Sequence, residues 1–114
     1  MFIRRLMTKP IAVIIACQNS DEAERISEVL LKRKLAACCN IFPNLNSVFL
    51  WPPGKGRFDY ADESMVLVKT LDSKWTDLEK AVLTVHSYDN PEIIAIPLSH
   101  VTKKYLSWME KELT

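Results

Sequence analysis

The sequence predicts a single α+β domain in which helices cover one face of an antiparallel sheet. Its 114 residues are the length of one ordinary domain, and its 48% hydrophobic and 25% charged residues are close to the globular average. Apolar runs typical of buried strands alternate with two stretches of helical periodicity. The predicted order is strand, helix, strand, strand, helix, strand, followed by a C-terminal helix.

The first strand and the first helix come from the N-terminal third of the chain. Residues 11–17 read IAVIIAC, an apolar and β-branched run typical of a central strand. Asn19 and Ser20 offer N-cap oxygens, and the helix dipole favours the acidic residues that follow them. An apolar stripe at helical spacing predicts the buried face of this helix. It contains Ala23, Ile26, Leu30 and Leu35.

A long hairpin is expected next. Residues 37–51 read as extended and contain Pro43, which predicts one long strand with a bulge, because sheets tolerate proline only at edges or bulges. Residues 52–56 hold both glycines of the chain and give its strongest turn signal, so we expect them at the hairpin tip. Residues 64–70 read SMVLVKT and predict the third strand.

The second half of the domain repeats the helix and strand pattern. Asp72 or Ser73 is expected to cap the second helix. Residues 93–98 read IIAIPL and predict the fourth strand, and apolar residues between Tyr105 and Leu113 predict a short closing helix. The buried stripe of the second helix is predicted to contain Trp75, Leu78, Val82 and Val85.

This order of elements predicts a ferredoxin-like topology (βαββαβ plus a C-terminal helix). Right-handed crossovers place both main helices on one face of an antiparallel sheet with strand order 4-1-3-2. The third strand is nevertheless apolar on both sides, with Val66 and Val68 opposed to Met65 and Leu67. The uncovered face would be a large apolar patch on a monomer, so we expect a homo-oligomer.

The N-terminal residues 1–9 are expected to form a frayed tail before a single domain at residues 10–114. The tail has no apolar run of signal-peptide length, so we expect it to be neither a signal peptide nor a membrane anchor. Met7 is an alternative start. The net charge of +1 provides no field that would attract nucleic acid or a membrane surface. Three cysteines without disulfide-scaffold spacing favour a reducing compartment, so the predicted location is cytoplasmic.

Potential metal ligands gather at one rim of the predicted sheet. The first strand ends at Cys17, the second helix ends near His86, and Tyr88, Asp89 and Glu92 precede the fourth strand. A thiolate, an imidazole and a carboxylate close together would form a transition-metal site that favours copper or zinc over magnesium. The alternative is structural, with Cys17 a small buried hydrophobe, His86 a helix C-cap and Asp89 a turn former.

Two further positions have open interpretations. Cys38 lies at the opposite end of the second strand from this rim, so a site shared with Cys17 would need a second subunit. Cys39 points to the opposite face from Cys38, and packing is the favoured role for both. Lys69 lies in an apolar strand, where an ammonium group needs a partner, which indicates either an intersubunit ion pair or a ligand contact.

The chain contains none of the common catalytic motifs. There is no nucleophile elbow, zinc-protease helix, P-loop or C-x-x-C. We therefore predict that the chain is not an enzyme and has no obligatory cofactor.

Several motifs closely resemble those of the CutA divalent-cation-tolerance family. They occur in the family's order and at nearly the family's spacing over most of the chain. They are KLAACCNIFP at residues 34–43, Ser47, Trp51 with Gly54 and Lys55, VKT at 68–70, HSYDNPEIIAIPL at 86–98 and YLSW at 105–108. Some positions depart from the family. Its usual H-P-Y-E is His86-Ser87-Tyr88-Asp89 here, and the acid of its hairpin would come from Asp59, Asp62 or Glu63.

The resemblance implies a homotrimer of ferredoxin-like subunits, joined through the long hairpin and the strand edges. It also implies a role in tolerance to divalent cations, notably copper, which some members bind. By position, Cys17, Cys38 and His86 match residues discussed as metal ligands in bacterial members. The residues that match the family's polar and aromatic cleft are Trp51, Lys69, Tyr88 and Glu92.

The predicted function is therefore a trimeric protein that binds copper or other divalent metal ions in cation homeostasis. The candidate metal ligands are Cys17, Cys38, His86 and Asp89. The alternative is a trimeric signalling or regulatory protein that binds a small molecule in clefts between subunits, at the four cleft residues. The expected partners are other copies of the chain and divalent metal ions, with neither nucleic acid nor a membrane among them.

Overall fold

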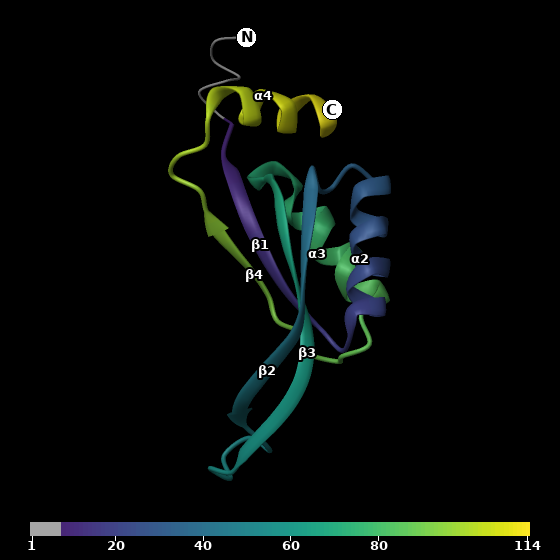
Figure 1. The fold of residues 1–114 in the computed structure, drawn as a ribbon, viewed down its shortest axis with the longest axis vertical. Coiled ribbons are helices and arrows are strands. Elements are labelled where there is room, and N and C mark those ends of the chain that lie inside the picture. The colour runs from purple at the N-terminus through teal and green to yellow at the C-terminus, as the bar shows by residue number, and fades with distance from the viewer. Residues whose placement is uncertain (1–7) are drawn as a thin grey trace.

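A four-stranded antiparallel sheet with helices against one face forms the domain in the computed structural model, which describes residues 8–114 (Figure 1). The strand order is β2-β3-β1-β4, which confirms the predicted order 4-1-3-2 and the α+β fold class. The elements are β1 (Pro10–Cys17), α2 (Ser20–Lys32), β2 (Cys38–Leu50), β3 (Phe58–Leu71), α3 (Trp75–Val85), β4 (Ile93–Pro97) and α4 (Lys103–Glu112).

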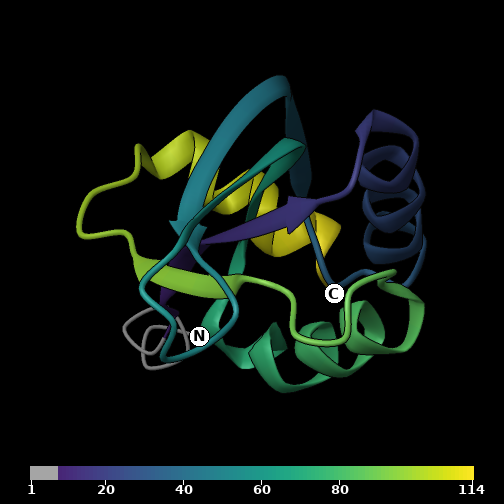
Figure 2. The same cartoon turned by 90° about the horizontal axis from the view of Figure 1, so that it is seen from below.

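The core lies between the sheet and the pair of helices α2 and α3, which lie side by side on one face (Figure 2). The central strand β1 contributes Val13 and Ile15, both fully buried, and α2 contributes Ile26 and Leu30. Helix α2 begins where predicted, because the side chain of Asn19 accepts a hydrogen bond of 2.9 Å from the Glu22 N–H. This core fixes the ends of β1 and α3 at the same rim of the sheet.

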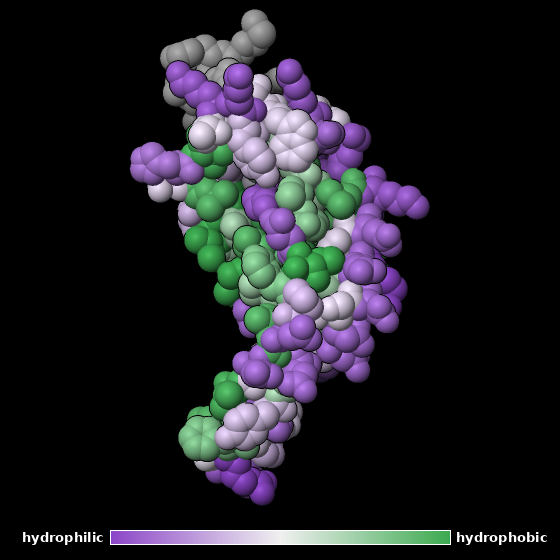
Figure 3. Space-filling model, viewed as in Figure 1, coloured by the Kyte–Doolittle hydropathy of each residue, from purple (hydrophilic) through white to green (hydrophobic). Residues whose placement is uncertain are grey.

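The opposite face of the sheet is apolar and largely uncovered among the described residues. Ile94 and Ile96 of β4 are 47% and 44% exposed, and Ile14 and Leu67 beside them are half-buried. Figure 3 shows hydrophobic side chains gathered over the sheet on the face in view. Helix α4 crosses only one end of the sheet, where its Met109 joins a small separate cluster.

Strands β2 and β3 continue past the helices as a two-stranded arm (Figure 1). Strand β2 is bulged between Phe42 and Leu45, as Pro43 predicted, and residues 52–56 form the turn at the tip. Strand β3 begins at Phe58 and is longer than predicted, because its backbone pairs with β2 almost to this turn. The arm exposes large apolar side chains. They are Val48, Phe49, Leu50, Trp51, Phe58 and Tyr60.

Two predictions about the second helix are wrong. Neither Asp72 nor Ser73 caps α3, because a 3-10 turn precedes the helix and the Trp75 N–H donates to the Asp72 carbonyl there. Val85 is 46% exposed instead of buried, and Ala81 takes its place in the stripe. Val85 is the last residue of α3, where the chain leaves the helix for an extended segment.

The N-terminal tail was predicted at residues 1–9, of which residues 1–7 lie outside the described part of the chain. The Thr8 hydroxyl donates a hydrogen bond of 2.8 Å to Glu110, and the Lys9 carbonyl accepts one of 2.7 Å from the Asp72 N–H. None of the helices within residues 8–114 has the length and apolarity needed to cross a bilayer.

Candidate functional site

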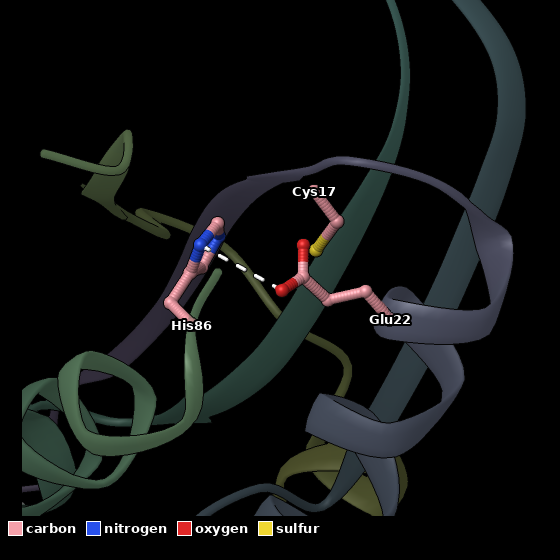
Figure 4. Close-up of side chains that lie close together, drawn as sticks. All are labelled: Cys17, Glu22 and His86. Atoms are coloured by element: carbon pink, nitrogen blue, oxygen red, sulfur yellow. Dashed lines mark ion pairs between the residues drawn. The ribbon is translucent and has the colours of Figure 1, made fainter. Parts of the chain in front are cut away.

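Three potential ligand atoms converge where β1 ends. Cys17, Glu22 and His86 each contribute one such atom, and these atoms lie within 4.8 Å of one another (Figure 4). They come from the last residue of β1, the first turn of α2 and the residue that follows α3. Cys17 is fully buried, and the side chains of His86 and Glu22 are 0% and 3% exposed. The predicted neighbourhood of Cys17 and His86 is therefore present, with Glu22 between them.

The carboxylate of Glu22 ties together segments that are distant in sequence. Its Oε1 accepts hydrogen bonds from the Gln18 N–H at 2.9 Å and from the Ser87 hydroxyl at 3.0 Å. Its Oε2 accepts a third from the Ser87 N–H at 2.7 Å. Burial acts to raise the pKa of Glu22, but the hydrogen bonds from Gln18 and Ser87 act in the opposite direction, and its pKa lies below the ordinary value. Glu22 is therefore an anion at neutral pH.

Both ring nitrogens of His86 have protein partners. Nδ1 accepts a hydrogen bond of 3.0 Å from the Tyr88 N–H, and Nε2 lies 2.8 Å from the Ala16 carbonyl oxygen. Because a carbonyl can only accept, these partners assign the proton to Nε2 and make the imidazole neutral. Nδ1 is also the ring nitrogen that lies 3.9 Å from Glu22 Oε2.

The thiol of Cys17 is strongly biased towards its protonated form. Burial raises its pKa to about 12, and the negative charges of Glu22 and Glu63 act in the same direction. The three cysteines of the chain are free, and Cys17 is the one that belongs to this cluster. A metal ion would therefore have to displace a proton in order to bind its sulfur.

A second polar group adjoins the cluster through Tyr88. The Tyr88 hydroxyl donates a hydrogen bond of 2.8 Å to Glu63 Oε2, and Glu63 Oε1 accepts one of 2.5 Å from the Ser47 hydroxyl. Burial and this contact with Glu63 raise the pKa of Tyr88, which keeps its hydroxyl protonated as a donor. The segment after α3 is thereby attached to the base of the β2–β3 arm.

The other predicted ligands lie outside the cluster of Cys17, Glu22 and His86. Cys38 is the first residue of β2 and pairs in register with Lys69, on the uncovered face. Asp89 is exposed in the turn after Tyr88. In the single chain the structure brings together only two of the four predicted ligands, Cys17 and His86.

The four predicted cleft residues also lie apart in one chain. Trp51 is at the arm tip, and the Lys69 ammonium donates to the Asn40 side chain on the uncovered face. Tyr88 adjoins the cluster of Cys17, Glu22 and His86, and Glu92 is exposed just before β4. A cleft built from these residues between copies of the chain stays a prediction.

Glu22 is the residue that sequence reasoning missed. It was interpreted only as an acid favoured by the helix dipole in the first turn of α2. The available signal was its spacing of three residues from the N-cap Asn19, the position from which a capping-box acid reaches back past the helix start. Glu63 was one of three candidates for the hairpin acid, and it is the one that contacts the site.

The comparison with known proteins decides the family. The family described as CutA1 divalent ion tolerance protein matches residues 11–112. This chain belongs to the CutA family. The resemblance predicted from the motifs is confirmed, and the family match covers the three residues of the cluster.

Curated relatives and solved structures of CutA agree along nearly the whole chain. The divalent-cation tolerance protein CutA of Archaeoglobus fulgidus is 39% identical over 87% of this chain and 93% of its own length. The one of Thermus thermophilus is 33% identical with the same coverage. The crystal structure of the CutA1 divalent ion tolerance protein of Ehrlichia chaffeensis superimposes with a TM-score of 0.87 at 28% identity, over 95% of this chain and 98% of that one.

The names of these three CutA relatives describe tolerance of divalent cations rather than a catalysed reaction. The relatives from rice and Arabidopsis thaliana are named chloroplastic, and the Archaeoglobus fulgidus structure is named periplasmic. Compartment therefore varies among proteins with these names. A cytoplasmic location for this chain stays a prediction.

Replacing Glu22 with glutamine should lower the free energy of unfolding at pH 7 by about 1.5–3 kcal/mol, because three hydrogen bonds lose a charged acceptor. The folded-state pKa of Glu22 lies below its ordinary value of 4.5. Its contribution is therefore present above that pH and lost as the pH falls through the folded-state value.

Guanidinium unfolding of both proteins between pH 7 and pH 3 measures this effect. The matched control is Glu24→Gln, which changes an exposed acid of the same helix. Equal stability of the Glu22 variant and the wild type at pH 7 would show that the carboxylate does not hold the site together.

Proposed function

We propose that this chain is a trimeric protein that binds divalent copper or zinc ions through Cys17, Glu22 and His86, in the homeostasis of these cations. The observation that carries the proposal is the convergence of the three ligand atoms within 4.8 Å in a buried position. Thiolate sulfur, imidazole nitrogen and carboxylate oxygen are the donor atoms of zinc and copper sites in proteins. The names of the relatives, which describe tolerance of divalent cations, support the same class of ligand.

The electrostatics of the site favour a cation. The carboxylates of Glu22 and Glu63 both act on the Cys17 thiol, and within residues 8–114 no lysine or arginine forms an ion pair with either of them. A divalent cation would balance this negative charge and would lower the cost of ionising the thiol. Glu22 is already ionised, Cys17 would contribute its thiolate, and His86 would contribute the lone pair on Nδ1.

The trimer is supported by surfaces that one chain leaves uncovered. The exposed apolar residues are grouped on two surfaces, the sheet face of Ile94 and Ile96 and the arm. Grouped exposure of this kind marks interaction surfaces, whereas single scattered apolar residues do not. They are different surfaces, so a contact between the arm of one copy and the sheet of the next is heterologous and can close into a ring. Strands β2 and β4 also end the sheet as edges that another copy can pair with.

Titration with Zn²⁺ or Cu²⁺ in a calorimeter should show about one ion bound per chain at the cluster. Removing a ligand in Cys17→Ser or His86→Ala should weaken binding by at least about 10- to 100-fold, the range already seen for loss of groups that only support a ligand. Wild-type protein that gives no binding heat with either ion would contradict the proposal.

Two matched variants separate the cluster from the ligand set predicted from the sequence. Cys38→Ser and Asp89→Asn change the two predicted ligands that lie outside it, and both should bind the ion as the wild type does. Loss of affinity in Asp89→Asn with none in Cys17→Ser would favour a site elsewhere on the rim.

Metal affinity should rise with pH, by up to about tenfold per unit near neutrality. The pKa of Cys17 is about 12, so the thiol is protonated before binding and releases one proton when it ligates the ion. Calorimetric titrations at pH 7.5 in buffers with different ionisation enthalpies would measure this release. The same series with Cys17→Ser should show about one proton fewer, and an equal release from both proteins would remove Cys17 from the ligand set.

Analytical ultracentrifugation should give about three times the chain mass of 13.1 kDa at micromolar concentration. Ile96→Asp places a charge on the uncovered face and should dissociate the assembly, because a buried charge without a partner is costly. Leu83→Asp is the matched control, since Leu83 is 51% exposed on α3, which lies on the other side of the sheet. A wild-type monomer would contradict the proposed assembly.

A further inference from the structure

The lone pair of His86 that faces the cluster is occupied. Nε2 is committed to the Ala16 carbonyl, within strand β1, and Nδ1 is the nitrogen on the side of Glu22. The Tyr88 N–H donates its hydrogen bond to this Nδ1 at 3.0 Å. A ring nitrogen has one lone pair, so a cation can bind Nδ1 only after the Tyr88 N–H has moved away.

The hydrogen bonds of Glu22 and Cys17 do not block a cation in the same way. An ionised carboxylate offers about four acceptor positions, and Glu22 uses three of them for Gln18 and Ser87. The Cys17 sulfur has only a weak contact of 3.9 Å with the Ile15 carbonyl. Access to His86 is therefore the step that the surrounding protein controls.

Tyr88 is held in its blocking position at a second point. Its hydroxyl donates to Glu63 Oε2 at 2.8 Å, and the Ser47 hydroxyl fixes the other oxygen of Glu63 at 2.5 Å. Glu63 and Ser47 belong to β3 and β2, where the arm leaves the sheet. The phenol ring also lies against the imidazole, with ring centroids 5.0 Å apart. Movement of the Tyr88 backbone away from His86 is opposed by this anchored side chain.

We propose that Tyr88 is a positioning residue that acts as a latch on the cation site, with its hydrogen bond to Glu63 keeping the Tyr88 N–H on His86 Nδ1. The inference rests on the proposed function, since it names the protein group that competes with the cation. The apparent affinity is the intrinsic affinity reduced by the fraction of molecules in which the latch is open. Weakening the latch therefore strengthens binding, which is the opposite of what losing a ligand does.

Tyr88→Phe tests the latch, because it removes the hydroxyl and keeps the ring and the backbone N–H. Zn²⁺ titration should show binding about five- to tenfold tighter than in the wild type, the change expected for loss of one hydrogen bond from the closed state. Amide hydrogen exchange at residue 88 in the metal-free protein should accelerate by a similar factor. Thr84→Val is the matched control, because it removes an exposed hydroxyl that only donates to the Lys80 carbonyl within α3, and it should change neither measurement.

Each result of this experiment has one interpretation. Zn²⁺ binding that is unchanged or weaker in Tyr88→Phe overturns the latch, and weaker binding with intact Glu22 contacts would make the phenol oxygen a ligand. A wild-type protein that binds neither Zn²⁺ nor Cu²⁺ overturns the proposed function instead. In that case the exchange rate decides alone: faster exchange at residue 88 in Tyr88→Phe supports the anchored hydrogen bond to His86, and an unchanged rate overturns it.

Discussion

The buried carboxylate of Glu22 is the interaction on which the candidate site depends. The fold brings the ends of β1 and α3 to the same rim, but it leaves their connecting segments free to diverge there. Glu22 joins them, because it accepts hydrogen bonds from Gln18 after β1 and from Ser87, which is 65 residues away in sequence. With Ser87 fixed, His86 and Tyr88 on either side of it are fixed too. The Glu22 carboxylate thus holds the segments after β1 and after α3 together at this rim through three hydrogen bonds.

The two faces of the sheet differ in how they are covered. One face of the sheet buries its side chains under α2 and α3, whereas the other presents isoleucines to solvent, with the Lys69 ammonium held by Asn40. A protein this small has few ways to cover such a face with its own chain. The arm extends two strands of the sheet beyond the domain and exposes apolar side chains that another copy could cover. The proposed assembly surface and the proposed cation site would therefore adjoin each other at the base of the arm, where Ser47 and Glu63 hold Tyr88.

The fold could be predicted because its strongest signals are local. The apolar run of β1, the Asn19 cap and the paired glycines each specify one element, and the right-handed crossover rule leaves one topology. The meeting of Cys17 and His86 followed from that topology. The spacing of Glu22 from the Asn19 cap indicated an acid that reaches back past the helix start, but not its contact with Ser87, because a partner 65 residues away leaves no local pattern. The exposure of Val85 and the 3-10 turn at Asp72 depend on where α3 begins and ends relative to the sheet on which it packs. The periodicity of the sequence does not reveal these two positions.

The proposed cation site would be selective, because its polar groups already have hydrogen-bond partners without a cation. An ion would have to displace the proton of the Cys17 thiol, whose pKa is about 12, and the Tyr88 N–H from Nδ1 before it gained two of its ligands. Only strong bonds to sulfur and nitrogen offset these costs, and copper and zinc form such bonds. Magnesium and calcium prefer oxygen ligands, of which the cluster offers the single carboxylate of Glu22. The hydrogen bonds that stabilise the metal-free fold would therefore also exclude the abundant hard cations and confine binding to conditions in which copper or zinc is in excess.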